Sequence, residues 1–321
     1  MNRTKIIEDI IFRSGYTQME KNSYLLIVQC LVIILSITKG FRYFYIEKYL
    51  KMISKGKSLN TFSYSQLSTF KSCPQQYKLI YLDGVRKTNE SIEAFMGKRV
   101  HEVLEWLYST ENRARPYITF DKLCQTFDNM WLEHWHKDIH IADTRKTSDY
   151  YYSIGKRCLS NYYGCYGPTF DQMVEDTEVD LRFTIGDHTF RGIIDRLDHP
   201  EPGKWIVHDY KTSKRPKTER QAINDIQLAL YQIAVEQNYG QVNEISLTWH
   251  FLRMGSEIKV LHTREQLEKL RAKLIRMVEE INNCIGNENH FLPKESILCH
   301  WCYLWEECTA KVGPNPVKRA D

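Results

Sequence analysis

The chain has 321 residues, enough for one large domain or two small ones, and its 42% hydrophobic content is ample for a packed core. The 44 basic residues nearly cancel the 40 acidic ones, so the formal net charge of +4 is too small to indicate a partner. The 9 cysteines are an odd number for a disulfide framework, and three of them lie within Cys299–Cys308, which favours metal ligation.

Residues 1–58 differ in composition from the rest of the chain, and we interpret them as an N-terminal extension. An uncharged, largely apolar span runs from Asn22 to Thr38, which is short of the ~20 residues that a membrane helix needs. It lies too far from the start of the chain for a signal peptide. A membrane anchor through residues 22–38, a buried extra helix and a non-native leader ahead of Met52 all fit this span. We favour a dispensable extension and do not expect the protein to be held at a membrane.

Two helical segments open the expected domain. Residues 63–83 begin with a serine cap at Ser63 or Ser65 and have apolar residues at helical spacing, and Pro74 is expected to start a second helix after Cys73. Residues 93–109 form a helix with one apolar face, and His101 lies next to that face. A single histidine on a helix is more often structural than a ligand, and HEVLE lacks the second histidine of the zinc-protease motif.

Residues 115–170 have a helical pattern and are rich in aromatic residues. The run WLEHWHKDIH places His134, His136 and His140 close together, and we interpret it as a surface helix because no cysteine or carboxylate pattern supports a metal site. The tyrosine clusters DYYYS and NYYGCYG could stack on nucleic-acid bases, but packing in a core or an interface explains them better.

From residue 174 the pattern changes to alternation, which predicts a hairpin with its turn at Gly186 and Asp187. Glu178 enters the same sheet and could add a carboxylate. Asp195 ends the apolar run of the next strand, and after a turn that includes Gly203 a further strand follows.

Asp209 and Lys211 follow the apolar run of that further strand. Residues two apart in a strand point to the same face, so these two side chains project together and an antiparallel neighbour can bring Asp195 beside them. Two carboxylates and a lysine at strand ends make a site for a hard divalent cation and an attacking water. A D-x-K sequence on its own is, however, more often a solvated pair on an exposed strand.

The remaining segments predict a helix at 224–240, a strand at 244–254 and a long amphipathic helix at 263–285. Gln227 and Tyr231 are four positions apart and share one face of the first helix. The basic run Lys211–Arg220 is either a solvated turn or a phosphate-binding segment. This order of elements predicts an α/β fold with a mixed central sheet flanked by helices. The sequence has no P-loop and hence no evident motor domain.

Four cysteines and four short motifs carry a resemblance to a known family. The cysteines are Cys73 far upstream and the run Cys299-x2-Cys302-x5-Cys308. The motifs occur in the family's order at Gly97–His101, Gly192–Asp195, Asp209–Lys211 and Gln227–Tyr231. Together they resemble the iron–sulfur subclass of RecB-like nucleases in the PD-(D/E)XK superfamily, a group that includes the AddB C-terminal nuclease, CRISPR-associated RecB-like nucleases and exonuclease V.

The resemblance covers residues 63–308 and implies a restriction-endonuclease-like core at 59–312, with a helical insertion at about 110–172 and a tail at 313–321. The long helical stretch after His101 departs from the smallest members and argues against a minimal CRISPR-type protein. By resemblance, Mg²⁺ or Mn²⁺ is expected at His101, Asp195, Asp209 and the backbone carbonyl near Tyr210.

The resemblance also implies roles for the remaining residues. Lys211 would orient the attacking water or stabilise the transition state, and Gln227 and Tyr231 would orient the site or the DNA. Cys73 and the three C-terminal cysteines would hold a 4Fe–4S cluster, although their spacing alone does not exclude zinc.

We therefore expect a metal-dependent DNA nuclease, acting as an exonuclease on DNA ends or single strands, in DNA repair, recombination or the processing of phage or mobile-element DNA. A CRISPR spacer-acquisition nuclease and an inactive DNA-binding or scaffolding module are the alternatives. DNA is the expected partner, with a helicase or recombination protein as a second one, and the expected location is the cytoplasm.

Overall fold

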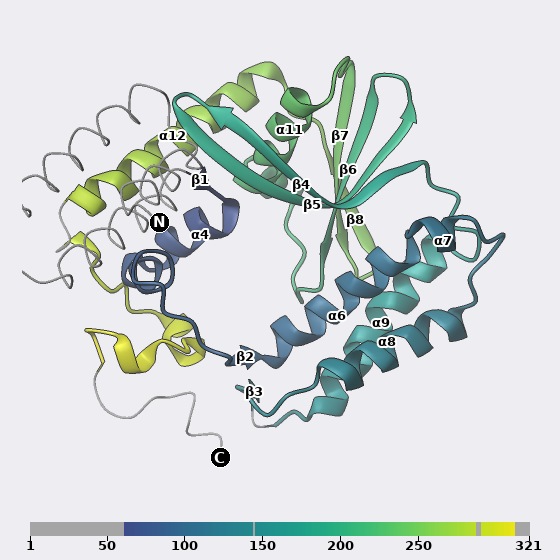
Figure 1. The fold of residues 1–321 in the computed structure, drawn as a ribbon, viewed down its shortest axis with the longest axis horizontal. Coiled ribbons are helices and arrows are strands. Elements are labelled where there is room, and N and C mark those ends of the chain that lie inside the picture. Colours follow the sequence, from purple (N-terminus) through teal and green to yellow (C-terminus); the bar gives the residue numbers. More distant parts are fainter. Residues whose placement is uncertain (1–60, 144, 287–289, 312–321) are drawn as a thin grey trace, which may run out of the picture. The chain divides into compact units, whose positions relative to one another are not determined.

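The computed structural model describes residues 61–143, 145–286 and 290–311 (Figure 1). All of them belong to Ser58–Asp321, one of the two compact units into which the chain divides. The apolar span at 22–38, Met52 and the expected tail at 313–321 lie outside the described residues.

The helices and strands follow one another in nearly the expected order. The helices are α4 (Tyr64–Ser72), α5 (Pro74–Tyr77), α6 (Ile92–Leu107), α7 (Thr110–Arg113), α8 (Phe120–His134), α9 (Ser148–Tyr166), α10 (Glu219–Ile223), α11 (Ile226–Asn238) and α12 (Arg264–Gly286). The strands are β1 (Thr61–Phe62), β2 (Glu90–Ser91), β3 (Ile139–His140), β4 (Val174–Ile185), β5 (His188–Glu201), β6 (Lys204–Lys211), β7 (Glu244–Phe251) and β8 (Ser256–Val260). A π-helical turn covers Lys78–Leu82, and short 3-10 helices cover Ile297–Trp301 and Trp305–Glu307.

The predicted mixed α/β architecture is confirmed. Strands β1, β4, β5, β6, β7 and β8 form a six-stranded sheet, in which β4–β5, β5–β6 and β7–β8 are antiparallel and β1–β5 and β6–β7 are parallel. The predicted turn joins β4 to β5, and Gly186 takes up the positive φ of 58° that it requires. Strand β5 is central, because β4 lies along one edge while β1 and β6 share the other.

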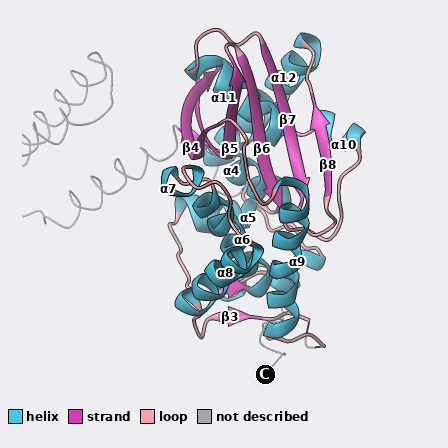
Figure 2. Cartoon of the chain, turned by 90° about the vertical axis from the view of Figure 1, so that its right-hand side faces the viewer, coloured by secondary structure: helices cyan, strands magenta, loops and turns pink. Residues whose placement is uncertain are grey.

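The two faces of the sheet carry separate hydrophobic cores. One core is formed by α4, α5, α11 and α12 with the sheet, and it includes Trp249 and Phe190, both almost fully buried. The other lies within the group α6, α8 and α9, where Tyr210 from β6 joins it. Figure 2 shows these three helices gathered beneath the sheet. Helix α6 therefore meets the sheet close to the end of β6.

Local sequence signals explain how the helices begin. The Ser63 hydroxyl accepts the backbone N–H of Gln66 at 3.3 Å while the Gln66 side chain accepts the N–H of Ser63 at 2.8 Å, a capping box that starts α4. Pro74 is the first residue of α5, as predicted, and Cys73 between the two helices is extended, with φ −159° and ψ 109°. This extended residue places the Cys73 side chain at a corner of the chain.

The predicted surface helix through the three histidines is wrong. Helix α8 ends at His134, and Trp135 has an extended ψ of 129°. The chain then turns back so that His140, in β3, pairs with Ser91 of β2. The physical reason is tertiary packing: Trp135 packs edge-on against Phe95 of α6 at 5.5 Å between ring centroids, and the chain beyond it pairs with β2.

Candidate active site at the ends of two strands

Strands β5 and β6 separate at the point where the predicted acids lie. Their backbone pairing ends with Arg196 opposite His208. Beyond it, the backbone N–H of Tyr210 donates to Oδ2 of Asp195 at 2.6 Å. The Asp195 carboxylate thus accepts the hydrogen bond that a backbone carbonyl of β5 would accept in a regular sheet, and it joins the two strands where they separate.

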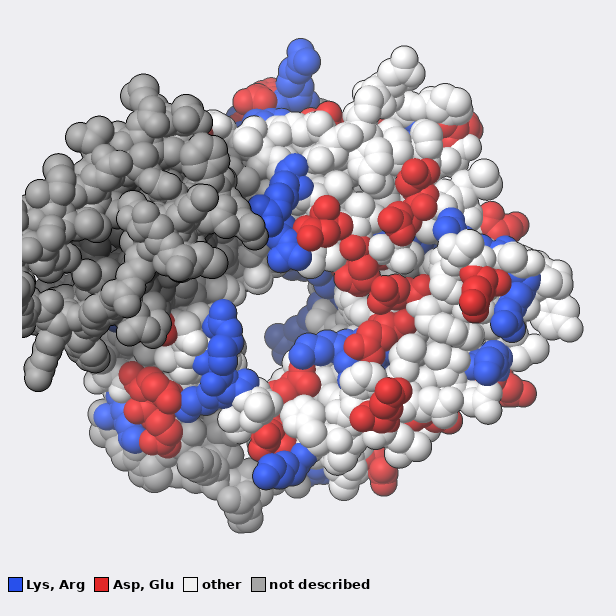
Figure 3. All heavy atoms as spheres, in the orientation of Figure 1, with Lys and Arg blue, Asp and Glu red and all other residues white. Residues whose placement is uncertain are grey.

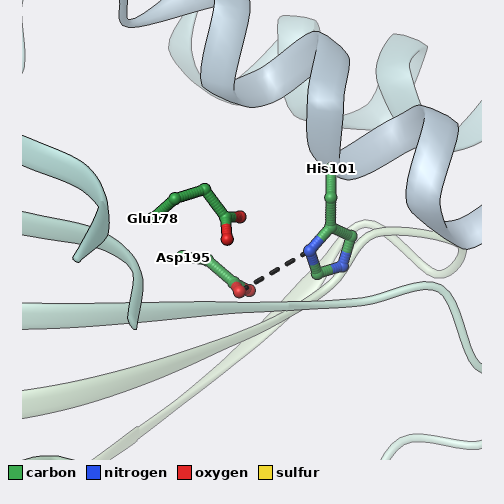
Figure 4. Close-up of side chains that lie close together, drawn as sticks. All are labelled: His101, Glu178 and Asp195. Carbon is green, nitrogen blue, oxygen red and sulfur yellow. Dashed lines mark ion pairs between the residues drawn. The ribbon is translucent and has the colours of Figure 1, made fainter. Parts of the chain in front are cut away.

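Helix α6 brings the predicted histidine to this point. His101 Nδ1 lies 3.6 Å from Asp195 Oδ1, as Figure 4 shows. His101, Asp195 and Glu178 each offer one ligand atom, and these three atoms lie within 4.8 Å of one another. Glu178 comes from β4 and has a positive φ of 49°, a rare conformation for a residue with a side chain. An imidazole and two carboxylates are ligands that a divalent cation accepts.

Asp209 lies beside this group, in a hydrogen-bonded pocket of its own. Its Oδ2 pairs with Lys211 Nζ at 2.5 Å, and its Oδ1 accepts Gln227 Nε2 at 3.0 Å. Gln227 Oε1 in turn accepts the lysine at 3.0 Å, and the Tyr231 hydroxyl lies 3.4 Å from Asp209 Oδ1. Gln227 and Tyr231, predicted to share one face of a helix, therefore both contact Asp209, and Gln227 also contacts Lys211.

Burial and neighbouring carboxylates raise the pKa values of two acids at this site, and the nearby cations offset this effect only in part. Burial raises the pKa of Asp209 to about 6, an effect that Lys211 reduces and the Asp195 carboxylate increases. Burial, followed by repulsion from Asp195, raises the pKa of Glu178 to about 7. Burial alone would also raise the pKa of Asp195, but His101 and the N–H of Tyr210 hold it below its ordinary value. Two carboxylates with raised pKa values beside a third that stays charged favour an added cation.

A comparison with known protein families decides what this geometry belongs to. The pattern of the PD-(D/E)XK nuclease superfamily matches residues 61–309, which span the whole sheet and both sets of helices. The chain is a PD-(D/E)XK nuclease. Members of this superfamily are hydrolytic nucleases that act on DNA with divalent metal ions, and the group of three ligands on β4, β5 and α6 is a fitting place for such an ion.

Two solved structures resemble this nuclease. A candidate exonuclease from Eubacterium rectale is 15% identical, with a TM-score of 0.47, and the match covers 86% of this chain and 96% of that one. SSO0001 is 16% identical, with a TM-score of 0.30, and the match covers 75% of this chain and 96% of that one. Both scores are below 0.5, so we draw nothing from them. A comparison with curated proteins gives no significant match.

The four predicted cysteines of the nuclease come together in space. Cys73, Cys299, Cys302 and Cys308 are all free thiols and line one cavity of about 480 Å³. Burial, and then the nearness of the other three sulfurs, raises the pKa of Cys302. The backbone N–H of Lys294 donates to the sulfur of Cys73 at 3.4 Å, and that of Ser296 donates to Cys299 at 3.4 Å.

A buried polar network supports the strands from the opposite face. Arg196, next to Asp195 in sequence, is fully buried; its Nε lies 2.9 Å from Asp198 Oδ1 and its Nη1 lies 3.2 Å from the Tyr210 hydroxyl. Its guanidinium also lies 4.6 Å from the ring centre of Tyr108, the residue that ends α6. One cation thus ties the His101 helix to both strands that carry the acids.

Sequence reasoning left Glu178 out of the predicted ligand set. In the hairpin, Thr177 pairs with Arg196 and Val179 with Ile194, so Glu178 stands opposite Asp195. The signal was available, because the two-residue turn at Gly186 and Asp187 fixes the register of both strands.

The basic run after β6 is divided in its contacts. Lys217 pairs with Asp225 at 2.6 Å and lies 4.4 Å from the Trp249 ring centre, whereas Lys214, Arg215 and Arg220 are exposed.

Among the described residues, none of the helices is both long and apolar enough to cross a membrane.

Proposed function

We propose that the protein is a Mg²⁺- or Mn²⁺-dependent deoxyribonuclease of the RecB-like group, acting as an exonuclease on DNA ends or single strands. The observation that carries the proposal is the crowding of Asp195, Glu178 and Asp209 where β5 and β6 part, with Lys211 and His101 opposing their charge. Such an arrangement is costly for folding and useful for binding a divalent cation and a phosphate.

The donor set fits a magnesium or manganese ion. His101, Asp195 and Glu178, whose ligand atoms lie within 4.8 Å of one another, would hold it. The resemblance adds Asp209 and the carbonyl of Tyr210 as further ligands. A bound ion of this kind lowers the pKa of a water ligand and offsets the charge that develops on the phosphate. Lys211, whose pKa is raised above its ordinary value by Asp209 although burial lowers it, stays charged and can orient that water or the phosphate oxygens.

Gln227 and Tyr231 position Lys211 and Asp209 without reacting themselves. The amide of Gln227 contacts both members of the pair, at 3.0 Å each, and so fixes the angle between the ammonium and the carboxylate. We expect Gln227→Ala to lower kcat more than it raises KM, because substrate binding does not depend on this contact.

An exonuclease needs a place where a strand end can enter. Figure 3 shows an opening in this face of the described residues, with Lys and Arg along one part of its rim and Asp and Glu along another. An opening of this kind suits a DNA end or a single strand better than an uninterrupted duplex. A DNA substrate also makes the cytoplasm the proposed location.

The deciding experiment compares cleavage of end-labelled single-stranded, end-labelled duplex and closed circular DNA with Mg²⁺ or Mn²⁺, in wild type and Asp209→Ala. We expect stepwise shortening of the linear substrates, no cut in the circle and no activity in the variant. Metal-dependent cleavage by Asp209→Ala would refute the assigned site, and cleavage of the closed circular DNA would show an endonuclease.

We further propose that the four cysteines hold a 4Fe–4S cluster. All four line one cavity of about 480 Å³, and the N–H···S bonds to Cys73 and Cys299 suit thiolate ligands of such a cluster.

Anaerobic purification tests the cluster. We expect coloured protein with iron and acid-labile sulfide, and the loss of both in Cys308→Ser. Colourless, folded protein loaded with zinc would overturn the cluster without affecting the proposed nuclease activity.

A further inference from the structure

A basic groove lies on the surface away from the carboxylates. It has a volume of about 400 Å³ and runs between α4–α5 on one side and α12 on the other. Lys71, Lys273, Arg276 and Lys294 line it, together with Phe70, Pro74, Met277 and Glu280. Four cations against one carboxylate leave an excess of three positive charges in one concave surface.

Two groove cations of α12, Lys273 and Arg276, differ in their pairing from Lys269 and Arg271 of the same helix. Lys269 pairs with Glu265 at 2.6 Å, and Arg271 lies 3.3 Å from Glu268. Within the described part of the chain, by contrast, no carboxylate lies within ion-pair distance of Lys273 or Arg276. Cations that have no carboxylate partner and that line a groove make a site for an external anion.

The end of α4 adds to this charge. Lys71 lies in its last turn and is exposed, and it too has no carboxylate partner among the described residues. Lys294 reaches across from the segment before the cysteine run and donates to the carbonyl of Lys71 at 3.3 Å. This bond holds the Lys294 ammonium at the end of α4, where the exposed Lys71 also lines the groove.

Helix α4 also connects the groove with the active site. At its first residue, the Tyr64 phenol is near enough to Lys211 to act on the pKa of that lysine. Lys71 is seven residues further on, which corresponds to about 10 Å along the helix axis. Helix α4 therefore runs from the neighbourhood of Lys211 to the groove.

We infer that this groove binds the phosphate backbone of the DNA strand a few nucleotides from the cleavage site, an inference that rests on the proposed nuclease function. A row of separate cations without acids suits a repeating phosphate chain better than an acidic peptide, whose carboxylates are irregularly spaced. The groove would hold the strand while the end is processed, and it would favour substrates longer than the active site alone can reach.

The test uses the full chain with Lys273→Gln and Arg276→Gln combined. Arg264→Gln combined with Lys269→Gln is the matched control, since these cations lie on the same helix outside the groove. Binding of a long single-stranded oligonucleotide is measured without divalent metal across a range of salt, and cleavage of a trinucleotide is measured with Mn²⁺.

We expect the groove variant to bind the long strand roughly tenfold more weakly at low salt and to lower the slope of log Kd against log salt by about 1.4. Its trinucleotide cleavage stays at the wild-type rate, and the exchange Lys273→Arg with Arg276→Lys keeps the binding. Equal affinity and slope in the groove variant, or equal losses in the control, overturn the inference. Wild type that neither binds nor cleaves DNA removes the proposed function itself, a result distinct from both.

Discussion

Replacing Asp209 by asparagine separates the electrostatic cost of this carboxylate from its role in metal binding. Its side chain is 2% exposed, and burial raises its pKa from 3.8 to about 6. A raised carboxylate pKa means that the charged form destabilises the folded protein: the penalty is absent below pH 3.8 and complete above about 6. A shift of about two units corresponds to about 3 kcal/mol.

The asparagine removes this penalty at mildly alkaline pH but leaves Lys211 without its partner. We therefore expect the free energy of unfolding of the metal-free variant to equal that of wild type or to exceed it by at most about 3 kcal/mol. Wild type at Mn²⁺ about 100 times its Kd gains about 2.7 kcal/mol, a rise in Tm of roughly 5–10 °C for a domain of this size. The variant lacks this rise, and its kcat falls by at least about 10³, or about 4 kcal/mol.

Thermal unfolding with and without Mn²⁺, followed by a cleavage assay, measures all three quantities. Asp180→Asn is the control, because Asp180 is an exposed carboxylate on β4 that pairs with Arg191 at 2.7 Å, outside the site. It should keep both the metal-induced rise in Tm and the activity. A metal-free Asp209→Asn protein clearly less stable than wild type would show that the carboxylates do not repel one another as argued, and retained cleavage would refute the assigned role.

Three further substitutions test other parts of the structure. Glu178→Gln should weaken Mn²⁺ binding at least about tenfold by calorimetry; unchanged affinity would exclude Glu178 from the ligand set. Glu257→Gln should lower the stability at neutral pH, because the hydrogen bond from His250 lowers the pKa of Glu257 to about 2. This stabilisation is present above the ordinary pKa of 4.5 and is lost as pH falls through 2. The difference in free energy of unfolding between wild type and variant, measured in urea, should therefore be smaller at pH 3 than at pH 7. Arg196→Met should cost at most about 3–5 kcal/mol in urea unfolding, because it leaves the buried Asp198 carboxylate with His208 Nε2, 3.0 Å away, as its remaining ion-pair partner among the described residues. Adding Asp198→Leu should restore most of this loss; no restoration would argue against an electrostatic cause.

The strands that carry the candidate site could be predicted because their signals are local. Apolar runs before Asp195 and before Asp209-x-Lys211 predict both strands, although β5 continues beyond Asp195 to Glu201 and only β6 ends close to its acid. The turn at Gly186 and Asp187 was equally readable, since few other residues take the backbone conformation that it requires. The position of the cysteines was predictable only through the resemblance, because no local pattern links Cys73 to the C-terminal run.

Other features depend on contacts that no local pattern contains. Strand β3 pairs with β2 through just two residues, Ile139 and His140, too few to show an alternating pattern. Strand β8 follows a turn at Gly255, and its residues are mostly exposed, so it lacks the hydrophobic run of a buried strand. The positive φ of Glu178, which lies between the paired residues Thr177 and Val179, likewise has no local signal in the sequence.

The cysteine cluster and the active site share α4, yet their roles can be separated. Cys73 and Cys299 are 226 positions apart, and linking them removes about 5 kcal/mol of chain entropy from the unfolded state. That is comparable with the whole stability of many domains, so we expect the loss of one ligand of the proposed cluster to unfold much of the protein. No cysteine belongs to the group of His101, Glu178 and Asp195. We therefore expect Cys308→Ser to lose activity in proportion to the folded fraction, with unchanged kcat per folded molecule, as active-site titration with a slowly cleaved DNA would measure. A folded fraction with reduced kcat would instead show that the cluster end of α4 controls Lys211 through Tyr64.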